Sequence, residues 1–180
     1  MGNECNSQDG LDEPAETGEE TRHRLEFLTE MEYVDEQRMA GALPDQQWKV
    51  HEYEVESDPS VISSLREKAT SAAREAGARG DTLSDIQIAV GEALTNAYRH
   101  GSPKKPENRI SLRCMTCPMA VVVEISDEGD RFDFDNCSDP DISQMRDHGM
   151  GIYLMRQAMD VVEFCCDCPG NRVRMIKWLL

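Results

Sequence analysis

A helical pattern runs through residues 81–101, DTLSDIQIAVGEALTNAYRHG. Its apolar residues recur at the spacing of one helix face, which predicts an amphipathic helix that starts near residue 81 and ends at Gly101. Glu92, Asn96 and His100 follow one another at intervals of four residues and therefore project from one stripe of this helix. Such a polar stripe is also typical of the solvated side of an amphipathic helix, so other segments must support a functional interpretation.

The residues before this helix predict a strand that leads into a further helix. A short β-prone run covers residues 48–55, and the sequence Ser57-Asp58-Pro59 follows it. Asp58 is a typical N-cap, and Pro59 suits the first turn of a helix. The apolar spacing continues to Gly77, where we expect this helix to end.

The residues after Gly101 predict two hairpins separated by one helix. Residues 127–148 are rich in Asp, Gly and Ser and lack apolar periodicity, which favours a functional loop. The resulting order is βααββαββ, and it predicts an α+β fold, a two-layer sandwich with helices on one face of a mainly antiparallel sheet. The expected elements are strands over 109–115 and 120–126 with a turn at 116–118, a helix over 149–160, and strands over 161–167 and 172–179.

The composition argues against several classes of protein. The chain has 35 acidic and 19 basic residues and a formal net charge of -16, which disfavours a broad electrostatic grip on nucleic acid or anionic lipid. No run of about 18 apolar residues is present to span a bilayer, and the start of the chain lacks the features of a signal peptide. We therefore expect a cytoplasmic protein that binds neither nucleic acid directly nor membranes.

The negative charge is concentrated in the first 47 residues. Residues 1–47 contain 13 acidic and 3 basic residues, a net charge of -10, and residues 1–22 have almost no apolar content, which is typical of disorder. A partial apolar stripe predicts a possible helix over residues 25–39. We expect residues 1–47 to be an acidic, largely disordered extension and residues 48–180 to form the folded domain. The extension could dock on the domain, on a partner or on nothing, and we favour a solvated regulatory tail.

Two further segments carry residue types suited to ligand binding. Asp127 and Gly129 directly follow the strand predicted at 120–126, which places a carboxylate at a strand end. An Asp-Gly pair in this position is also a plain turn signal. The run His148-Gly149-Met150-Gly151 precedes an apolar helix, whose free N–H groups and positive dipole end favour anions. A lone Gly-x-Gly is equally typical of an ordinary junction between a loop and a helix.

The combination of the three segments, in this order, is more specific than any one of them. They read Glu92-Ala-Leu-Thr-Asn96-Ala-Tyr-Arg-His100-Gly101, then Asp127-Glu-Gly129-Asp-Arg-Phe132-Asp133, then His148-Gly149-Met150-Gly151-Ile-Tyr-Leu-Met-Arg. Together they resemble the N, G1 and G2 boxes of the GHKL superfamily of ATPases and kinases, and more narrowly the bacterial anti-sigma-factor serine kinases of stress-response and sporulation switches. The resemblance covers about residues 48–180 and implies a Bergerat ATP-binding fold that uses ATP and Mg²⁺.

The resemblance implies a role for each motif residue. Glu92 would be the catalytic residue, a general base for the attacking hydroxyl near the γ-phosphate. Asn96, one turn later, would give a neutral oxygen to Mg²⁺, and Asp127 would accept a hydrogen bond from the adenine amino group. The other implied ATP contacts are Gly129, Gly149, Met150 and Gly151, with Arg99, His100, Arg146 and His148 as further candidates. For Arg99, Arg146 and His148, a plain surface role is the alternative.

Two positions depart from the pattern of the superfamily. Arg131 stands where the second glycine of the G1 box is usual, and we expect altered packing on the adenine side with binding retained. The threonine that many relatives carry at the start of the last strand is absent from residues 170–173, which puts one adenine contact in doubt. A Walker A motif and a His-Arg-Asp catalytic loop are also absent, which argues against P-loop and eukaryotic-type kinases.

Two function hypotheses follow from the resemblance. In the first, the chain is a homodimeric protein kinase that phosphorylates a serine or threonine of a small STAS-type anti-sigma-factor antagonist and otherwise sequesters a sigma factor. In the second, it is an ATP-gated protein-binding module, or a positive switch kinase of the same fold that binds no sigma factor.

The seven cysteines are expected to stay as thiols, because the sequence carries no secretory signal. Cys114 with Cys117, and a second cluster at residues 165–168, together resemble a zinc set. The expected topology puts these two clusters at opposite ends of the sheet, so we favour thiols that fill sheet positions over a metal site.

Overall fold

The structure of this chain is a computed structural model, which describes residues 47–101, 107–130, 150–165 and 169–179. The order of elements in these ranges is the predicted βααββαββ. The helix predicted over 25–39, the rest of the N-terminal extension and the loop over 131–148 lie outside the described residues. The elements are β1 Lys49–Glu56, α3 Pro59–Ala76, α4 Gly80–Gly101, β2 Arg109–Cys117, β3 Ala120–Asp127, α5 Met150–Ala158, β4 Val161–Phe164 and β5 Asn171–Trp178.

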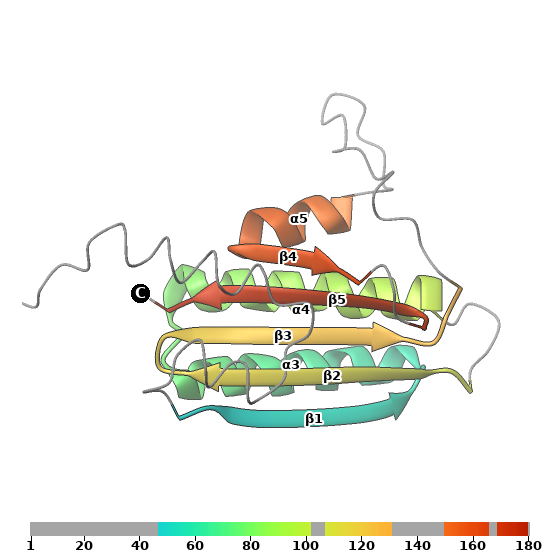
Figure 1. Cartoon of the computed structure of the whole chain (residues 1–180), viewed down its shortest axis with the longest axis horizontal. Helices are drawn as coiled ribbons and strands as arrows, with labels where there is room; N and C mark the ends of the chain where they lie inside the picture. Colours follow the sequence, from blue (N-terminus) through green and yellow to red (C-terminus); the bar gives the residue numbers. More distant parts are fainter. Residues whose placement is uncertain (1–46, 102–106, 131–149, 166–168, 180) are drawn as a thin grey trace, which may run out of the picture. The chain divides into compact units, whose positions relative to one another are not determined.

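The strands form one sheet in the order β1-β2-β3-β5-β4, and all four neighbouring pairs are antiparallel. The helices α3 and α4 run behind the sheet in the view of Figure 1. α5 packs mainly on α4 and also contacts β4. The predicted α+β sandwich, with helices on one face of an antiparallel sheet, is therefore confirmed.

The signals at both ends of α3 act as the sequence predicts. The Asp58 side chain accepts a hydrogen bond of 2.7 Å from the backbone N–H of Ser60, which satisfies one of the free donors of the first turn. The hydrogen bond from Ser60 lowers the pKa of Asp58 from its ordinary value of 3.8. At the other end, Gly77 has a φ of 119°, a conformation in which glycine is favoured over residues with a side chain.

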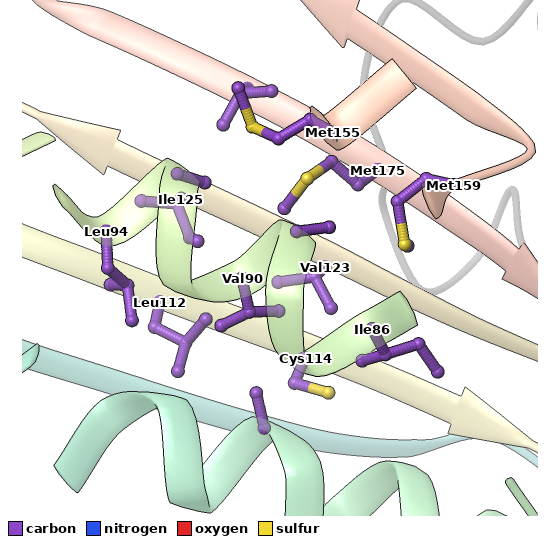
Figure 2. Close-up of a cluster of buried hydrophobic side chains, with 14 of the residues drawn as sticks. Ile86, Val90, Leu94, Leu112, Cys114, Val123, Ile125, Met155, Met159 and Met175 are labelled. Carbon is purple, nitrogen blue, oxygen red and sulfur yellow. The ribbon is translucent and has the colours of Figure 1, made fainter. Parts of the chain in front are cut away.

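The core lies between the sheet and the helices. α4 contributes Ile86, Val90 and Leu94 to it, each fully buried, at the spacing of one helix face. Figure 2 shows these side chains pointing toward Leu112, Cys114, Val123 and Ile125 of the sheet, with Met155, Met159 and Met175 beside them. Because this face of α4 is fixed against β2 and β3, the polar stripe on the same helix is held in a defined position.

The β2–β3 hairpin differs slightly from the prediction. Thr116 and Cys117 were expected in the turn, but both belong to β2, where they pair with Val121 and Ala120. Their side chains are buried, so pairing and packing override the weak turn signal of these residues. The turn consists of Pro118 and Met119 alone.

Cys117 and Cys165, described members of the two cysteine clusters, lie at different ends of the sheet. Cys117 is level with Trp178 through Ala120, whereas the backbone N–H of Cys165 bonds to the carbonyl oxygen of Arg172. Six residues of β5 separate these two levels, about 20 Å. Within the described ranges, no group of three or more His, Cys, Asp or Glu is placed to hold a metal ion. No helix in the same ranges is long and apolar enough to cross a bilayer.

Candidate ATP site

A polar corner forms where β3 ends and β5 begins. Asp127 and Asn171 are register partners on these two strands. The Nδ2 of Asn171 donates a hydrogen bond to Oδ1 of Asp127 at 2.9 Å, and the backbone N–H of Gly129 donates to the same oxygen at 2.9 Å. Both bonds fall on Oδ1, so Oδ2 is the oxygen of Asp127 that we expect to meet a ligand.

Asp127 is a buried carboxyl group with only 7% of its surface exposed. Burial raises its pKa above the ordinary value, because the charged form loses hydration. The hydrogen bonds from Asn171 and Gly129 and the nearby charge of His100 act in the opposite direction. These few contacts therefore stabilise the ionised form of the Asp127 carboxylate against the effect of burial.

Three chain segments approach one another closely beside Asp127. A Cβ atom added to Gly101 would lie 2.6 Å from the Asp127 side chain, and one added to Gly129 would overlap the backbone of Gly101. Asn108 links the same segments, since its Nδ2 donates to the carbonyl oxygen of Gly101 at 2.8 Å and to that of Glu128 at 3.3 Å. The C-terminal end of α4 is thereby joined to the loop after β3, and only glycine fits at these two contacts.

The other end of the site lies where α5 begins beside α4. A Cβ atom added to Gly151 would lie 2.9 Å from Oε2 of Glu92 and 3.4–3.5 Å from the side-chain amide of Asn96. The G2 glycine therefore stands directly beside the two polar residues of α4. Glu92 and Asn96 are both half-buried, as expected for side chains that line a site at the edge of the core.

α4 connects the two ends of this site. Nine residues separate Glu92 from Gly101, which corresponds to about 13.5 Å along a helix axis. This length is comparable with that of an extended nucleoside triphosphate, from its base to its last phosphate. The geometry suits a nucleotide whose base meets Asp127 and whose terminal phosphate lies near Glu92.

Comparison with known proteins matches residues 55–177 to the histidine kinase-like ATPase domain. The serine-protein kinase RsbW of Bacillus subtilis (strain 168) is 31% identical over an alignment of 136 residues, and the match covers 71% of this chain and 84% of that protein. RsbW of Staphylococcus aureus is 29% identical over an alignment of 139 residues, and the match covers 71% and 86% of the two chains.

The chain belongs to the histidine kinase-like ATPase family. Within this family it is of the type represented by the RsbW serine-protein kinases, which confirms the resemblance seen in the three sequence boxes and the expected kinase class.

A solved structure supports the fold assignment. The crystal structure of the RsbU and RsbW domains of Rv1364c from Mycobacterium tuberculosis matches with a TM-score of 0.54 at 14% identity. The match covers 72% of this chain and 32% of that longer chain.

Of the predicted site residues that the structure describes, five have contacts at one of the two ends of the site and three are exposed nearby on α4 and α5. Asp127 and Gly129 lie in the polar corner, and Glu92, Asn96 and Gly151 lie at the other end of the site. Arg99 and His100 are exposed on the last turn of α4, and Met150 is 40% exposed at the start of α5. Arg131, Arg146, His148 and Gly149 lie outside the described residues, so their roles remain predictions.

Two asparagines of the site are missing from the predicted set. Asn171 stands at the strand start where the family threonine was expected, and its side chain bonds directly to Asp127. The sequence did contain a signal for Asn171. It is a polar residue directly after Gly170, at the turn of the closing hairpin, which the expected topology places at the end of the sheet where the nucleotide was expected. Asn108 gave no such signal, because its contacts with Gly101 and Glu128 depend on how distant segments meet.

Proposed function

We propose that this chain is an ATP-dependent serine/threonine-protein kinase of the partner-switching type. The observation that carries the proposal is that Gly151 lies against Glu92 and Asn96, while α4 extends from these residues to the polar corner at Asp127. Residues 48–180 would form the kinase domain and residues 1–47 a regulatory extension. ATP use follows from the family, and the assignment of each residue below is part of the proposal.

In this mechanism, Oδ2 of Asp127 accepts a hydrogen bond from the adenine amino group. Asn96 is suited to Mg²⁺, because an amide oxygen is a hard neutral ligand and this cation usually takes its remaining ligands from phosphates and water. When bound, Mg²⁺ supplies charge neutralisation at the phosphates. Glu92 accepts the proton of the substrate hydroxyl as that oxygen attacks the γ-phosphorus and ADP leaves.

The proposed protein substrate is a serine or threonine of a small STAS-type anti-sigma-factor antagonist. In its other state the kinase would hold a sigma factor. The relatives named serine-protein kinase RsbW support the kinase part of this assignment. We further propose that the protein acts in the cytoplasm as a homodimer. The chain's excess of acidic residues, with 35 acids against 19 bases, favours partner surfaces that are basic.

The replacement Glu92→Gln tests the proposal, because it removes the base and keeps the shape of the side chain. We expect transfer from labelled ATP to an antagonist protein to fall at least about 100-fold, with ATP affinity in calorimetry nearly unchanged. If the wild-type protein binds ATP and controls its partner but transfers no phosphate, the ATP-gated binding module is the better description. If it binds no nucleotide with Mg²⁺ present, both hypotheses are wrong.

A further inference from the structure

We infer that Asn171 is a positioning residue that makes this site selective for adenine over guanine nucleotides, by holding Asp127 as an ionised acceptor. The inference rests on the proposed function, since it concerns the same nucleotide site. Asn171 does not belong to the three sequence boxes. Its contacts in the structure indicate that it positions Asp127.

The first step is that the Asn171 amide is fixed in one orientation. Its Nδ2 donates to Oδ1 of Asp127 at 2.9 Å and to the carbonyl oxygen of Asp130 at 3.0 Å. These two bonds use both hydrogens that a side-chain amide carries. Asn171 is 6% exposed, and Gly170 before it has a φ of 70° and is packed on the backbone of Asp127. The amide is thus held at the carboxylate from a rigid strand end.

The second step concerns the charge on Asp127. Burial disfavours the charged form, and the described groups that favour it are the Asn171 amide, the Gly129 N–H and the charge of His100. Among these three, the hydrogen bond from Asn171 has the largest effect on the pKa. The neighbouring Glu128 carboxylate bonds to the backbone N–H of Arg109 instead. Loss of the Asn171 amide therefore moves Asp127 further toward its protonated form.

The third step is the difference between the two bases. Adenine carries an amino donor at the ring position where guanine carries a carbonyl oxygen. An ionised carboxylate only accepts hydrogen bonds, so it pairs with the adenine donor and repels the guanine carbonyl. A protonated carboxyl group has an O–H donor, which can bond to that same carbonyl oxygen. The protonation state of Asp127 therefore decides which base the corner accepts.

The experiment compares Mg²⁺-ATP and Mg²⁺-GTP binding by calorimetry between pH 5.5 and 8 on the full chain. Wild-type protein should favour ATP at least about 100-fold at neutral pH, since the site rejects a base that lacks the donor. Asn171→Ala should weaken ATP binding roughly 10-fold at neutral pH. The ratio of ATP to GTP affinity of this variant should fall further as the pH falls, because a larger fraction of the Asp127 side chains becomes protonated. Asn171→Thr keeps one O–H donor and should restore most of the preference.

Asn108→Ala is the matched control, because Asn108 holds the same corner without touching the Asp127 carboxylate. We expect Asn108→Ala to lower the affinities for ATP and GTP by the same factor at every pH. If Asn171→Ala behaves in this way too, its role is structural and the inference is wrong. Should Asn171→Ala fail to fold, Asn171→Val, which has the shape of threonine but no donor, is measured in its place. An ATP preference of that variant that does not depend on pH overturns the inference.

The test separates this inference from the proposed function. If wild-type protein binds neither ATP nor GTP, the proposed nucleotide site itself is wrong. If it binds ATP selectively and the Asn171 variants keep the wild-type ratio of ATP to GTP affinity, only the inference about Asn171 fails.

Discussion

Replacing Gly151 with alanine should slow phosphoryl transfer while the protein becomes no less stable. The new Cβ would lie 2.9 Å from Oε2 of Glu92, whereas ordinary contacts of a Cβ lie at 3.4–4 Å. The Glu92 carboxylate must therefore move by about 0.5 Å or rotate away. A misplacement of about 1 Å can cost about 100-fold in rate, so half of that corresponds to roughly 10-fold, or about 1.4 kcal/mol in the barrier.

The adjacent helix offers a matched control for this substitution. Gly91 precedes Glu92 on α4, and a Cβ added there would lie 3.3 Å from Cδ of the flexible Arg66 side chain. Gly91→Ala should raise the free energy of unfolding by about 0.5–1 kcal/mol, as glycine-to-alanine changes in helices commonly do. Transfer by this control should stay at the wild-type rate.

The assay is single-turnover transfer from labelled ATP to an antagonist protein, together with ATP calorimetry and urea unfolding for each variant. We expect Gly151→Ala to keep most of its ATP affinity, because Asp127 lies at the other end of the site. A wild-type transfer rate in a stably folded Gly151→Ala protein would refute the placement of Glu92 at the reacting phosphate. An equal loss of rate in Gly91→Ala would show that the effect is not specific to the contact.

Two further predictions concern stability. The Lys177 side chain is 15% exposed, and its Nζ donates to Asp85 at 3.0 Å and to the carbonyl oxygen of Ala158 at 2.7 Å. Lys177→Met should therefore lower the free energy of unfolding, measured in urea, by about 1–3 kcal/mol. An unchanged urea midpoint would contradict this prediction. Asp58 has a lowered pKa in the folded state, so its cap stabilises fully above its ordinary value of 3.8 and less as the pH falls below it. The difference in melting temperature between wild type and Asp58→Ala should therefore shrink in acid, and a difference that stays constant with pH would show that the cap does not act through its charge.

The order of elements and one end of the site could be predicted from the sequence because local signals determine them. Asp58 and Gly77 mark the ends of α3 through capping, which depends only on neighbouring residues. Glu92 and Asn96 share a stripe because helix geometry fixes their spacing. Gly151 was implied by the motif, but its place beside the Glu92 carboxylate, where an added Cβ would lie 2.9 Å from Oε2, depends on how α5 packs against α4.

The polar corner could be predicted only in part, because its contacts join residues that are distant in the sequence. Asp127 and Asn171 are 44 residues apart and meet through the pairing of β3 with β5. The absence of the expected threonine put one adenine contact in doubt, and the structure shows at this strand start an amide that bonds to the Asp127 carboxylate. The turn residues Thr116 and Cys117 were misassigned for a related reason, since strand pairing and burial outweighed their local preference.

In the proposed mechanism, α4 rather than a loop sets the distance between base recognition at Asp127 and phosphoryl transfer at Glu92. No glycine or proline lies between Glu92 and Gly101, and Ala93, Leu94 and Ala97 of this stretch are buried in the core. The helix therefore cannot lengthen or bend without disturbing the packing of the domain. In the proposed mechanism, a base held at Asp127 would therefore fix where the terminal phosphate meets Glu92. It follows that substitutions in the polar corner should impair nucleotide binding and transfer together, whereas those beside Glu92 should impair transfer alone.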